Sequence, residues 1–300
     1  MMSVLNEMRI RVTSGAGFFA ALDQSGGSSP AALRTYGVAD GAYSTDEQMF
    51  GLMHAMRVRI MTAPAFTSER ILAAILFVDT MDRSVQGVPT PTYLWKDRGV
   101  VPFVKVDQGL EAEADGVQML KPIQGLDETL ERAARLEVFG TKARSVIHRA
   151  SKDGVGAVVD QQFDLAEQVA GHGLTAIVEP EILITSPDKA EAEAMLRDAL
   201  LRRLDRLPDG RQVVVKVTLP ETADFYAALS AHAGVARLVA LSGGYSRDEA
   251  CRRLAMNHDM IASFSRALIG DLRLTMSDAV FDATLADAIT QIYTASTQKS

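Results

Sequence analysis

The sequence predicts a (β/α)₈ barrel, and three observations lead to this fold class. Short apolar runs alternate with longer segments of helical periodicity, about eight such runs occur, and no Pro- or Gly-rich linker divides the 300 residues. Alternating strands and helices fold as right-handed parallel units, and about eight units close a barrel. We therefore expect residues 1–300 to form a single barrel domain with short N-terminal and C-terminal tails.

The short apolar runs are the expected strands. They are continuous rather than alternating, which is typical of parallel strands buried on both faces. An open doubly wound sheet is the competing architecture, and it would usually carry a Gly-rich turn directly after its first strand. The runs cover residues 17–22, 71–78, 101–106, 145–147, 174–178, 213–217, 238–241 and 260–264.

Between these runs the sequence predicts amphipathic helices with recognisable starts. Thr45 with Gln48, and Ser246 with Glu249, have the spacing of capping boxes. Ser186 and the proline after it fit the N-cap and first-turn positions of another helix. We interpret the apolar faces as core packing rather than ligand surfaces. These faces comprise Met49, Leu52, Met53, Met56 and Ile60; Leu196, Leu200, Leu204 and Leu207; and Phe281, Leu285, Ile289 and Ile292.

Composition limits the partners and the compartment. A formal net charge of −7 gives no general attraction to nucleic acid or to anionic membranes. The longest apolar run, residues 71–78, is far shorter than the roughly 20 residues that a membrane helix needs. The first twelve residues do not resemble a signal peptide, and Cys251 is the single cysteine, so no internal disulfide can form. We expect a soluble cytoplasmic protein without nucleic-acid or membrane partners.

Three lysines lie in or beside apolar strands, and each has two possible explanations. They are Lys105 in VPFVKV, Lys142 in GTKAR and Lys216 in VVVKV. A buried ammonium is costly, so each lysine either pairs with a carboxylate or has a chemical role. Burial among valines and the presence of other lysines disfavour the charged form of Lys216. A neutral amine can attack a ketone and form an imine, so we expect Lys216 to be a nucleophile.

Acidic residues stand at the ends of two expected strands. Glu179 and Glu181, in VEPE, alternate on an extended segment, so both carboxylates can face one site. Paired carboxylates support general acid–base steps; the alternative is a salt bridge from each to Lys142 or Lys216, and the two interpretations are compatible because such pairs also set protonation states. Asp23 ends the first apolar run; it either begins a turn or occupies the strand end where barrel enzymes place catalytic groups.

The last two loops predict a phosphate site. Ser242, Gly243 and Gly244 follow the seventh strand, and Arg266 follows the eighth. Loops after these strands commonly bind phosphate in barrels, since glycine allows close approach of the backbone and arginine grips phosphate in a fork. The five histidines are scattered, with no pair at the spacing of zinc enzymes, so we expect no metal site.

Taken together, these residues resemble the Schiff-base type of fructose-bisphosphate aldolase (class I), in particular its bacterial branch. The resemblance runs from residue 17 to about residue 272 and implies a (β/α)₈ barrel. It is carried by the segments ALDQSGGSSPAAL, ILFVDTMDR, VVPFVKVDQGL, GTKARSVI, IVEPEI, VVVKVTLP, VALSGGYSRDEA and IASFSRAL, which occur in the family's order.

The resemblance implies a role for each motif residue. Lys216 resembles the imine-forming lysine, Asp23 the residue of carbon–carbon cleavage, and Glu179 the acid–base residue of imine formation. Glu181 and Lys142 resemble the partners of Glu179. The residues that resemble substrate or phosphate contacts are Lys105, Arg144, Ser242, Gly243, Gly244, Arg266, Ser25 and Ser28.

The implied reaction is reversible aldol cleavage of fructose 1,6-bisphosphate to dihydroxyacetone phosphate and glyceraldehyde 3-phosphate. It serves glycolysis and gluconeogenesis in this family, needs no cofactor or metal, and takes small sugar phosphates as partners. The resemblance further implies a homo-oligomer. A basic cluster inside an acidic chain would attract the doubly charged substrate, because a cleft focuses the local potential.

Two departures keep alternatives open. Family members often carry basic residues where this chain has Ser29, Pro30, Ala31 and Ala32, so an aldolase acting chiefly on another ketose bisphosphate, such as sedoheptulose 1,7-bisphosphate, is one alternative. A non-catalytic binding protein on the same fold is another, although it would be expected to lose the lysine and the acids. Tyr293 lies in a C-terminal tail that does not match that of the animal members, and it is left unassigned.

Overall fold

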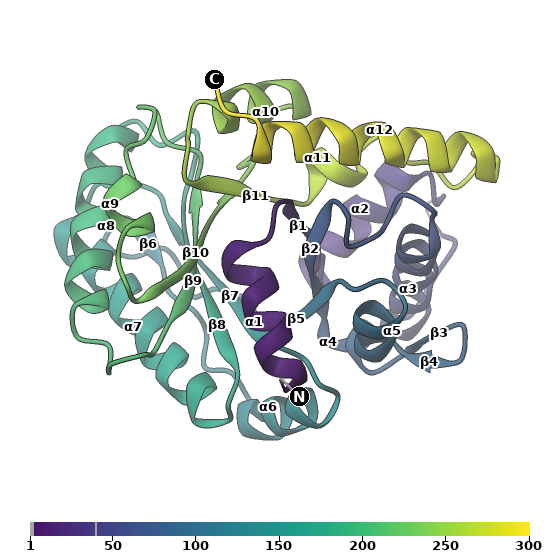
Figure 1. Ribbon diagram of the computed structural model, residues 1–300, viewed down its shortest axis with the longest axis horizontal. Coiled ribbons are helices and arrows are strands. Elements are labelled where there is room, and N and C mark those ends of the chain that lie inside the picture. Colours follow the sequence, from purple (N-terminus) through teal and green to yellow (C-terminus); the bar gives the residue numbers. More distant parts are fainter. Residues whose placement is uncertain (1–2, 40) are drawn as a thin grey trace.

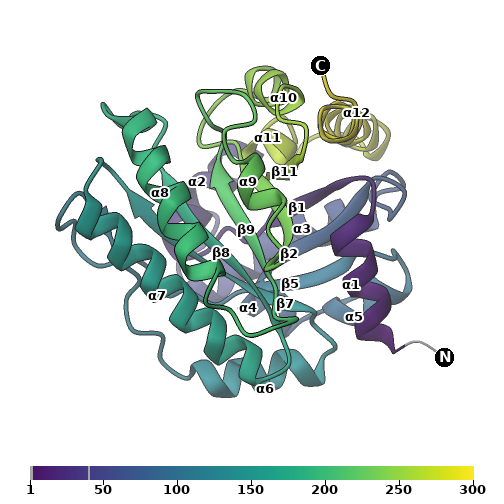
Figure 2. The same cartoon turned by 60° about the vertical axis from the view of Figure 1, so that its left-hand side comes forward.

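The computed structural model describes residues 3–39 and 41–300, and within them eight parallel strands close into a barrel (Figures 1 and 2). Each barrel strand pairs with the next one along the chain, and the last pairs with the first. The predicted fold class is therefore confirmed. The strands are β1 (Phe18–Leu22), β2 (Ile71–Phe77), β5 (Val101–Lys105), β7 (Gly140–Ile147), β8 (Thr175–Ile182), β9 (Val213–Thr218), β10 (Val235–Leu241) and β11 (Met260–Phe264).

Helices surround the barrel (Figure 2), and three short strands lie in its loops (Figure 1). None of the helices in the described part of the chain is long and apolar enough to cross a membrane. β3 (Ser84–Val85) and β4 (Val88–Pro89) form a hairpin, and β6 (Val117–Gln118) pairs antiparallel with β7. The helices are α1 (Val4–Ser14), α2 (Ser29–Tyr36), α3 (Asp46–Thr62), α4 (Val78–Met81), α5 (Thr90–Lys96), α6 (Leu126–Arg135), α7 (Lys152–Gly171), α8 (Lys189–Leu204), α9 (Ala227–Ser230), α10 (Arg247–Ala255), α11 (Arg266–Ile269), α12 (Asp278–Thr297) and the 3₁₀ helix η1 (Gly26–Ser28).

Three strands, β7, β8 and β10, are at least three residues longer than the sequence predicts, and in β7 and β8 the additional residues include candidate site residues. Lys142 lies inside β7 rather than before it, and β8 continues through Glu179 and Glu181 to Ile182. The predicted bounds of these two strands are therefore wrong, although Glu181 does lie at the end of its strand, as the second-last residue of β8. The reason is that oppositely charged side chains on neighbouring strands can continue a ladder: Arg144 of β7 stands opposite Glu179 of β8.

Two of the three predicted helix starts are confirmed. The hydroxyl groups of Thr45 and Ser246 accept hydrogen bonds from the backbone N–H groups three residues later, at the starts of α3 and α10. The predicted start of α8 at Ser186 is wrong, since the helix begins at Lys189 with Asp188 as its N-cap. The proline between Ser186 and Asp188 occupies a turn, a position for which its fixed φ angle suits it, and the helix starts after that turn.

An N-terminal helix that the sequence analysis did not predict packs at one end of the barrel. Met8 and Val12 of α1 are fully buried and belong to the same apolar cluster as the barrel interior. Figure 1 shows α1 lying across the barrel. The Arg237 guanidinium on β10 fastens the end of this helix by donating to the carbonyl oxygens of Thr13 (2.7 Å) and Gly15 (2.9 Å). The helix therefore closes the end of the barrel at which the strands begin.

Candidate active site

The charged residues inside the barrel follow from the two-residue period of the strands. Ala21, Phe103, Ile177 and Val214 form part of the inner apolar cluster, and side chains two positions further along a strand point to the same side. These next positions, nearer the carboxyl ends of the strands, all carry charge. They are Asp23, Lys105, Glu179 and Lys216. A layer of apolar side chains thus lies below a layer of charged side chains. The charged layer is at the carboxyl end of the strands, where enzymes of this fold have their active sites.

Lys216 is buried beside a carboxylate. Its side chain leaves β9 between two fully buried valines, Val215 and Val217, and the residue is 3% exposed. The Nζ atom of Lys216 lies 2.8 Å from Oε1 of Glu179, which is equally buried. The sequence correctly placed this lysine in an apolar strand and next to an acid. That its amine is neutral when it attacks a carbonyl stays a prediction.

Lys142 occupies the centre of the charged layer. Its Nζ atom lies 2.7 Å from Oδ2 of Asp23, 3.0 Å from Oε2 of Glu179 and 3.9 Å from Oδ2 of Asp107. Glu179 therefore holds one lysine on each carboxylate oxygen. Lys142 and Glu179 lie on β7 and β8, and Asp23 and Asp107 follow β1 and β5, so closure of the barrel brings residues of four strands together.

The ion pairs fix the charge states of this cluster. Burial alone would raise the pKa values of Asp23 and Glu179, but Lys142 and Lys216 lower both below their ordinary values. Burial would lower the pKa of Lys142, yet Asp23, Glu179 and Asp107 together raise it above its ordinary value. Both acids are therefore ionised and Lys142 is protonated at neutral pH.

Two more ion pairs extend the cluster. Lys105 Nζ contacts Asp107 through the carboxylate Oδ1 (2.7 Å) and the backbone carbonyl (2.8 Å). Arg144 donates to Oε2 of Glu181 at 2.8 Å, and its backbone N–H donates to Oδ2 of Asp107 at 3.2 Å. Asp107 was missed by the sequence analysis. The signal was present, because Asp107 stands two residues after Lys105 and so faces the same side.

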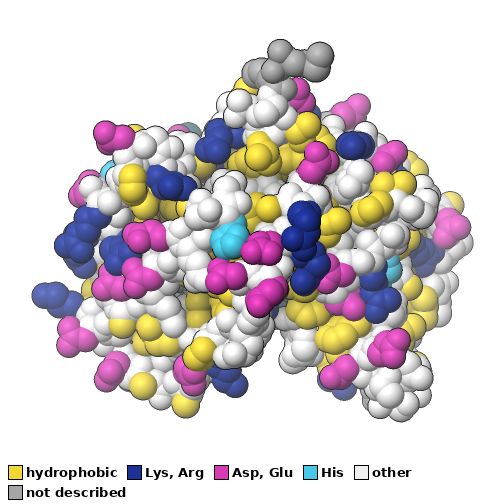
Figure 3. Space-filling model, turned by 90° about the horizontal axis from the view of Figure 1, so that it is seen from below, with side chains coloured by type: hydrophobic (Ala, Val, Ile, Leu, Met, Phe, Trp, Pro, Cys, Tyr) yellow, Lys and Arg dark blue, Asp and Glu magenta, His cyan; other side chains and the backbone are white. Residues whose placement is uncertain are grey.

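We call Asp23, Lys105, Asp107, Lys142, Arg144, Glu179, Glu181 and Lys216 the charged network. Its four acids and four cations balance one another. On the face of the molecule shown in Figure 3, acidic and basic side chains are interspersed instead of gathering in one basic patch. Three of the cations predicted from the sequence, Lys105, Lys142 and Arg144, lie in this network, and their carboxylate partners balance their charge.

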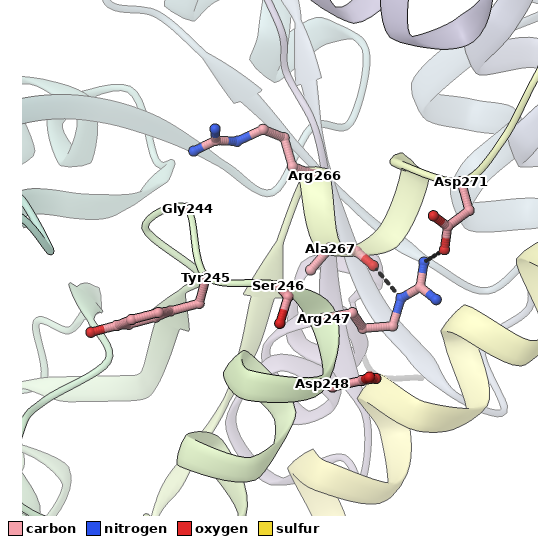
Figure 4. A pocket seen from close by; sticks show the side chains of 8 residues that line it. All are labelled: Gly244, Tyr245, Ser246, Arg247, Asp248, Arg266, Ala267 and Asp271. Carbon is pink, nitrogen blue, oxygen red and sulfur yellow. Dashed lines mark hydrogen bonds and ion pairs between the residues drawn. The ribbon is translucent and has the colours of Figure 1, made fainter.

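The predicted phosphate loops lie next to each other (Figure 4). Gly243 and Gly244 have φ angles of +61° and +115°, and a Cβ atom on Gly243 would come within 2.6 Å of Ile184 Cγ2, so the turn requires glycine there. A Cβ atom on Gly244 would lie 3.6 Å from an Nη atom of Arg266. Arg266 is exposed, and within the described part of the chain its guanidinium makes no hydrogen bond or ion pair. An arginine beside an open glycine turn can receive an anion.

A pocket of about 380 Å³ adjoins this turn and includes Gly244 and Arg266 in its lining. The second arginine of the pocket, Arg247, already has partners: its guanidinium donates to the Ala267 carbonyl and pairs with Asp271 at 2.6 Å. Figure 4 shows Arg266 pointing away from that pair. The predicted arginine is thus the one whose charge remains available. Ser242 is buried at the start of the turn.

The first loop is tied to the last one. Gln24 follows Asp23 and donates through Nε2 to the hydroxyl of Ser265 (2.6 Å), the residue before Arg266. The backbone carbonyl of Gln24 accepts a hydrogen bond from the fully buried Arg57 on α3. Ser25 and Ser28 lie just beyond, at η1, where the Ser28 hydroxyl bonds the backbone of Ser25 at 3.0 Å. Within the described residues, the hydrogen bonds of these two serines join them to each other and not to the charged network, so their part in binding stays a prediction.

The remaining sequence predictions concern groups outside the barrel mouth. Tyr293 lies on α12, packed against the core, with the Arg70 guanidinium 5.9 Å from its ring centre. Cys251 lies within α10 and is half-buried. Across residues 3–39 and 41–300, no group of three or more His, Cys, Asp and Glu side chains is arranged to hold a metal ion.

Comparison with known proteins gives a consistent result. The family model described as fructose-bisphosphate aldolase class-I matches residues 9–222, more than half of the chain. A curated Synechocystis protein named fructose-bisphosphate aldolase class 1 is 53% identical over 286 residues, which cover 95% of each protein. The solved structure of the Plasmodium falciparum fructose-bisphosphate aldolase, crystallised with TRAP and an inhibitor, superposes with a TM-score of 0.77. That alignment covers 99% of this chain and 96% of the other at 18% identity, a likeness of fold.

Proposed function

The chain belongs to the class-I fructose-bisphosphate aldolase family, and from that premise we propose that it reversibly cleaves fructose 1,6-bisphosphate through an imine on Lys216. The observation that carries the proposal is the continuous contact from Lys216 through Glu179 and Lys142 to Asp23. This contact joins a nucleophile to a proton-transfer group, and that group to a second acid, within one buried cluster. Glycolysis and gluconeogenesis are the pathways that such a reaction serves.

In the first step, Lys216 attacks the ketone carbon of the open-chain sugar. Transfer of a proton from the Lys216 ammonium to the Glu179 carboxylate, 2.8 Å away, gives a free amine and a protonated acid together. The amine adds to the ketone, and Glu179 then donates its proton to the departing hydroxyl group. Water leaves, and the iminium carries the positive charge that the ammonium held before.

In the second step, Asp23 removes the proton of the C4 hydroxyl group. The C3–C4 bond breaks, its electrons move to the iminium to form an enamine, and glyceraldehyde 3-phosphate leaves. The lowered pKa of Asp23 means that its carboxylate is ionised and able to accept a proton when substrate arrives. Lys142, 2.7 Å away, holds this carboxylate in place. Protonation and hydrolysis of the enamine release dihydroxyacetone phosphate.

The two phosphates are proposed to bind at the two linked loops. Ser242, Gly243, Gly244 and Arg266 would hold the phosphate nearest the ketone. Ser25, Ser28, Lys105 and Arg144 would receive the rest of the substrate and the far phosphate. The hydrogen bond from Gln24 to Ser265 supports this assignment, because it sets the distance between the two loops.

The choice of sugar is the finer part of the proposal. Ala31 and Ala32 begin α2 without a positive charge, so the far phosphate has fewer cations than in relatives with basic residues there. Measuring kcat/KM for fructose 1,6-bisphosphate and for sedoheptulose 1,7-bisphosphate tests the assignment. If kcat/KM is higher for sedoheptulose 1,7-bisphosphate, that sugar and not fructose 1,6-bisphosphate is the preferred substrate.

The direct test of activity is a cleavage assay on the purified chain, with coupled detection of both triose phosphates. We expect cleavage to proceed equally with and without EDTA, because the imine takes the role of electron sink that a metal has in other aldolases. Absence of cleavage, or its loss on chelation, would contradict the proposal. We also propose that the chain acts in the cytoplasm as one barrel domain that self-associates, which light scattering would test.

A further inference from the structure

A glutamine outside the barrel contacts the strand that carries Glu179. Gln162 lies on α7 and is 1% exposed. Its Nε2 donates to the Ala143 carbonyl (3.1 Å) and to the Ser145 hydroxyl (2.9 Å), and its Oε1 accepts from the backbone N–H of Glu179 (3.4 Å). One side chain thus bonds both β7 and β8 at the level of the charged network.

The two backbone groups that Gln162 contacts, the Ala143 carbonyl and the Glu179 N–H, face each other in the β7–β8 ladder. The register places Arg144 opposite Glu179, and in a parallel ladder the N–H of Glu179 faces the carbonyl of the residue before Arg144, which is Ala143. The amide of Gln162 therefore lies where the two strands meet. On β8 it contacts the backbone of Glu179, and on β7 it contacts the residue between Lys142 and Arg144.

Near Glu179 the β8 strand has a full register with β7 but only a short one with β9. The paired register of β8 with β9 covers Ile177 and Val178 and stops before Glu179. The next residue of β8 is Pro180, which has no N–H to donate to a neighbour. The backbone at Glu179 is consequently fixed from the β7 side, where Gln162 adds its bond.

We propose that Gln162 is a positioning residue that sets the Glu179 carboxylate between Lys142 and Lys216. Gln162 touches neither the substrate nor the two lysines, and it acts through the main chain of Glu179 and of β7. The inference rests on the proposed acid–base function of Glu179. Proton transfer depends on hydrogen-bond distance, so a small shift of this strand slows imine formation, while binding of the phosphate nearest the ketone, which uses the loops after β10 and β11, is preserved.

The test compares Gln162→Met with Gln161→Met and Glu179→Gln. Methionine matches glutamine in length but cannot bond the two strands. Gln161 is the matched control, since it precedes Gln162 on α7 and its amide bonds Leu120 (2.8 and 3.0 Å) rather than β8. The readout is the rate at which borohydride traps the adduct of dihydroxyacetone phosphate. We expect Gln162→Met to slow trapping by on the order of tenfold, and Gln161→Met to trap at the wild-type rate. The KM of Gln162→Met for fructose 1,6-bisphosphate, measured in the cleavage assay, should stay close to that of the wild type.

A second variant, Gln162→Glu, separates positioning from a loss of stability. A buried carboxyl group has a raised pKa, and its protonated form can donate to Ala143 as the amide does. The trapping rate of Gln162→Glu relative to wild type should therefore rise as the pH falls, whereas the ratio for Gln162→Met stays constant. A purely structural role would lower the melting temperature without this pH signature.

The outcomes are distinguishable. Wild-type trapping by Gln162→Met, together with slow trapping by Glu179→Gln, would overturn the inference and leave the proposed function intact. Wild-type trapping by Glu179→Gln would instead overturn the proposed function of Glu179 and the inference with it. If Gln162→Met does not fold, the pH dependence of Gln162→Glu decides, and a constant ratio to wild type would overturn the inference.

Discussion

Glu179 Oε1 lies 2.8 Å from Lys216 Nζ inside the barrel, and both residues are 3% exposed. A proton can move between these atoms without passing through water. The second oxygen of Glu179 faces Lys142, whose pKa is raised by the surrounding carboxylates, so Lys142 keeps its charge while Lys216 and Glu179 exchange theirs. This division of labour between two lysines is the basis of the predictions below.

Glu179→Gln should slow imine formation. The amide preserves the shape of the side chain but can neither take a proton from Lys216 nor return it to the departing hydroxyl. We expect the rate of borohydride trapping with dihydroxyacetone phosphate to fall by about 10²-fold or more, the usual contribution of general acid–base catalysis. An unchanged trapping rate would show that another group moves these protons.

Asp23→Asn should separate cleavage from imine formation. Asp23 contacts Lys142 and not Lys216, so the imine with dihydroxyacetone phosphate should still form and be trapped. Cleavage of fructose 1,6-bisphosphate should fall by about 10²–10⁴-fold, because the C4 hydroxyl loses its base. Loss of trapping and cleavage in equal measure would contradict the assignment of Asp23 to the carbon–carbon bond.

The two buried acids should make stability depend on acid pH. Their pKa values are lowered in the fold, so the stability they contribute is present above the ordinary values of 3.8 and 4.5 and is lost as the pH falls below them. We expect the free energy of unfolding to drop between about pH 5 and pH 3, and to drop less steeply in Asp23→Asn. Urea denaturation across this range measures both slopes, and equal slopes would contradict the ion-pair account.

Arg266→Ala should weaken phosphate binding. The guanidinium is unpaired in the described residues and lies against the Gly244 turn, so its charge is available to the substrate. A charge-assisted hydrogen bond contributes about 1.5–3 kcal/mol, which corresponds to a fall in kcat/KM of roughly 10- to 150-fold. Arg247→Ala is the control, because Arg247 lines the same pocket but is paired with Asp271. An equal effect of both substitutions would argue against a specific phosphate contact.

Much of the barrel and its site could be predicted from the sequence because the strand period is so regular. The apolar runs predict the positions of the eight strands. The lysines and acids at or next to several of these runs predict where the apolar layer of the barrel interior gives way to charged side chains. The limits of β7 and β8 could not be predicted, since the pairing of Arg144 with Glu179 across two strands is not visible in either strand alone.

Other features depend on contacts between distant segments. Asp107 shares a face with Lys105, but its contacts with Lys142 and the Arg144 backbone exist only after closure of the barrel. Gln162 lies on a helix and shows no motif, and its position where β7 and β8 meet follows from packing. The helix α1 buries Met8 and Val12 against residues that come together only in the closed barrel.

The identity of the nucleophile is the central claim, and mapping the reduced adduct tests it most directly. Wild-type protein treated with dihydroxyacetone phosphate and borohydride should carry one stable modification, located by peptide mass spectrometry on Lys216. The Lys216→Met variant should carry none. An adduct on Lys105 or Lys142, or one that persists in Lys216→Met, would contradict the account.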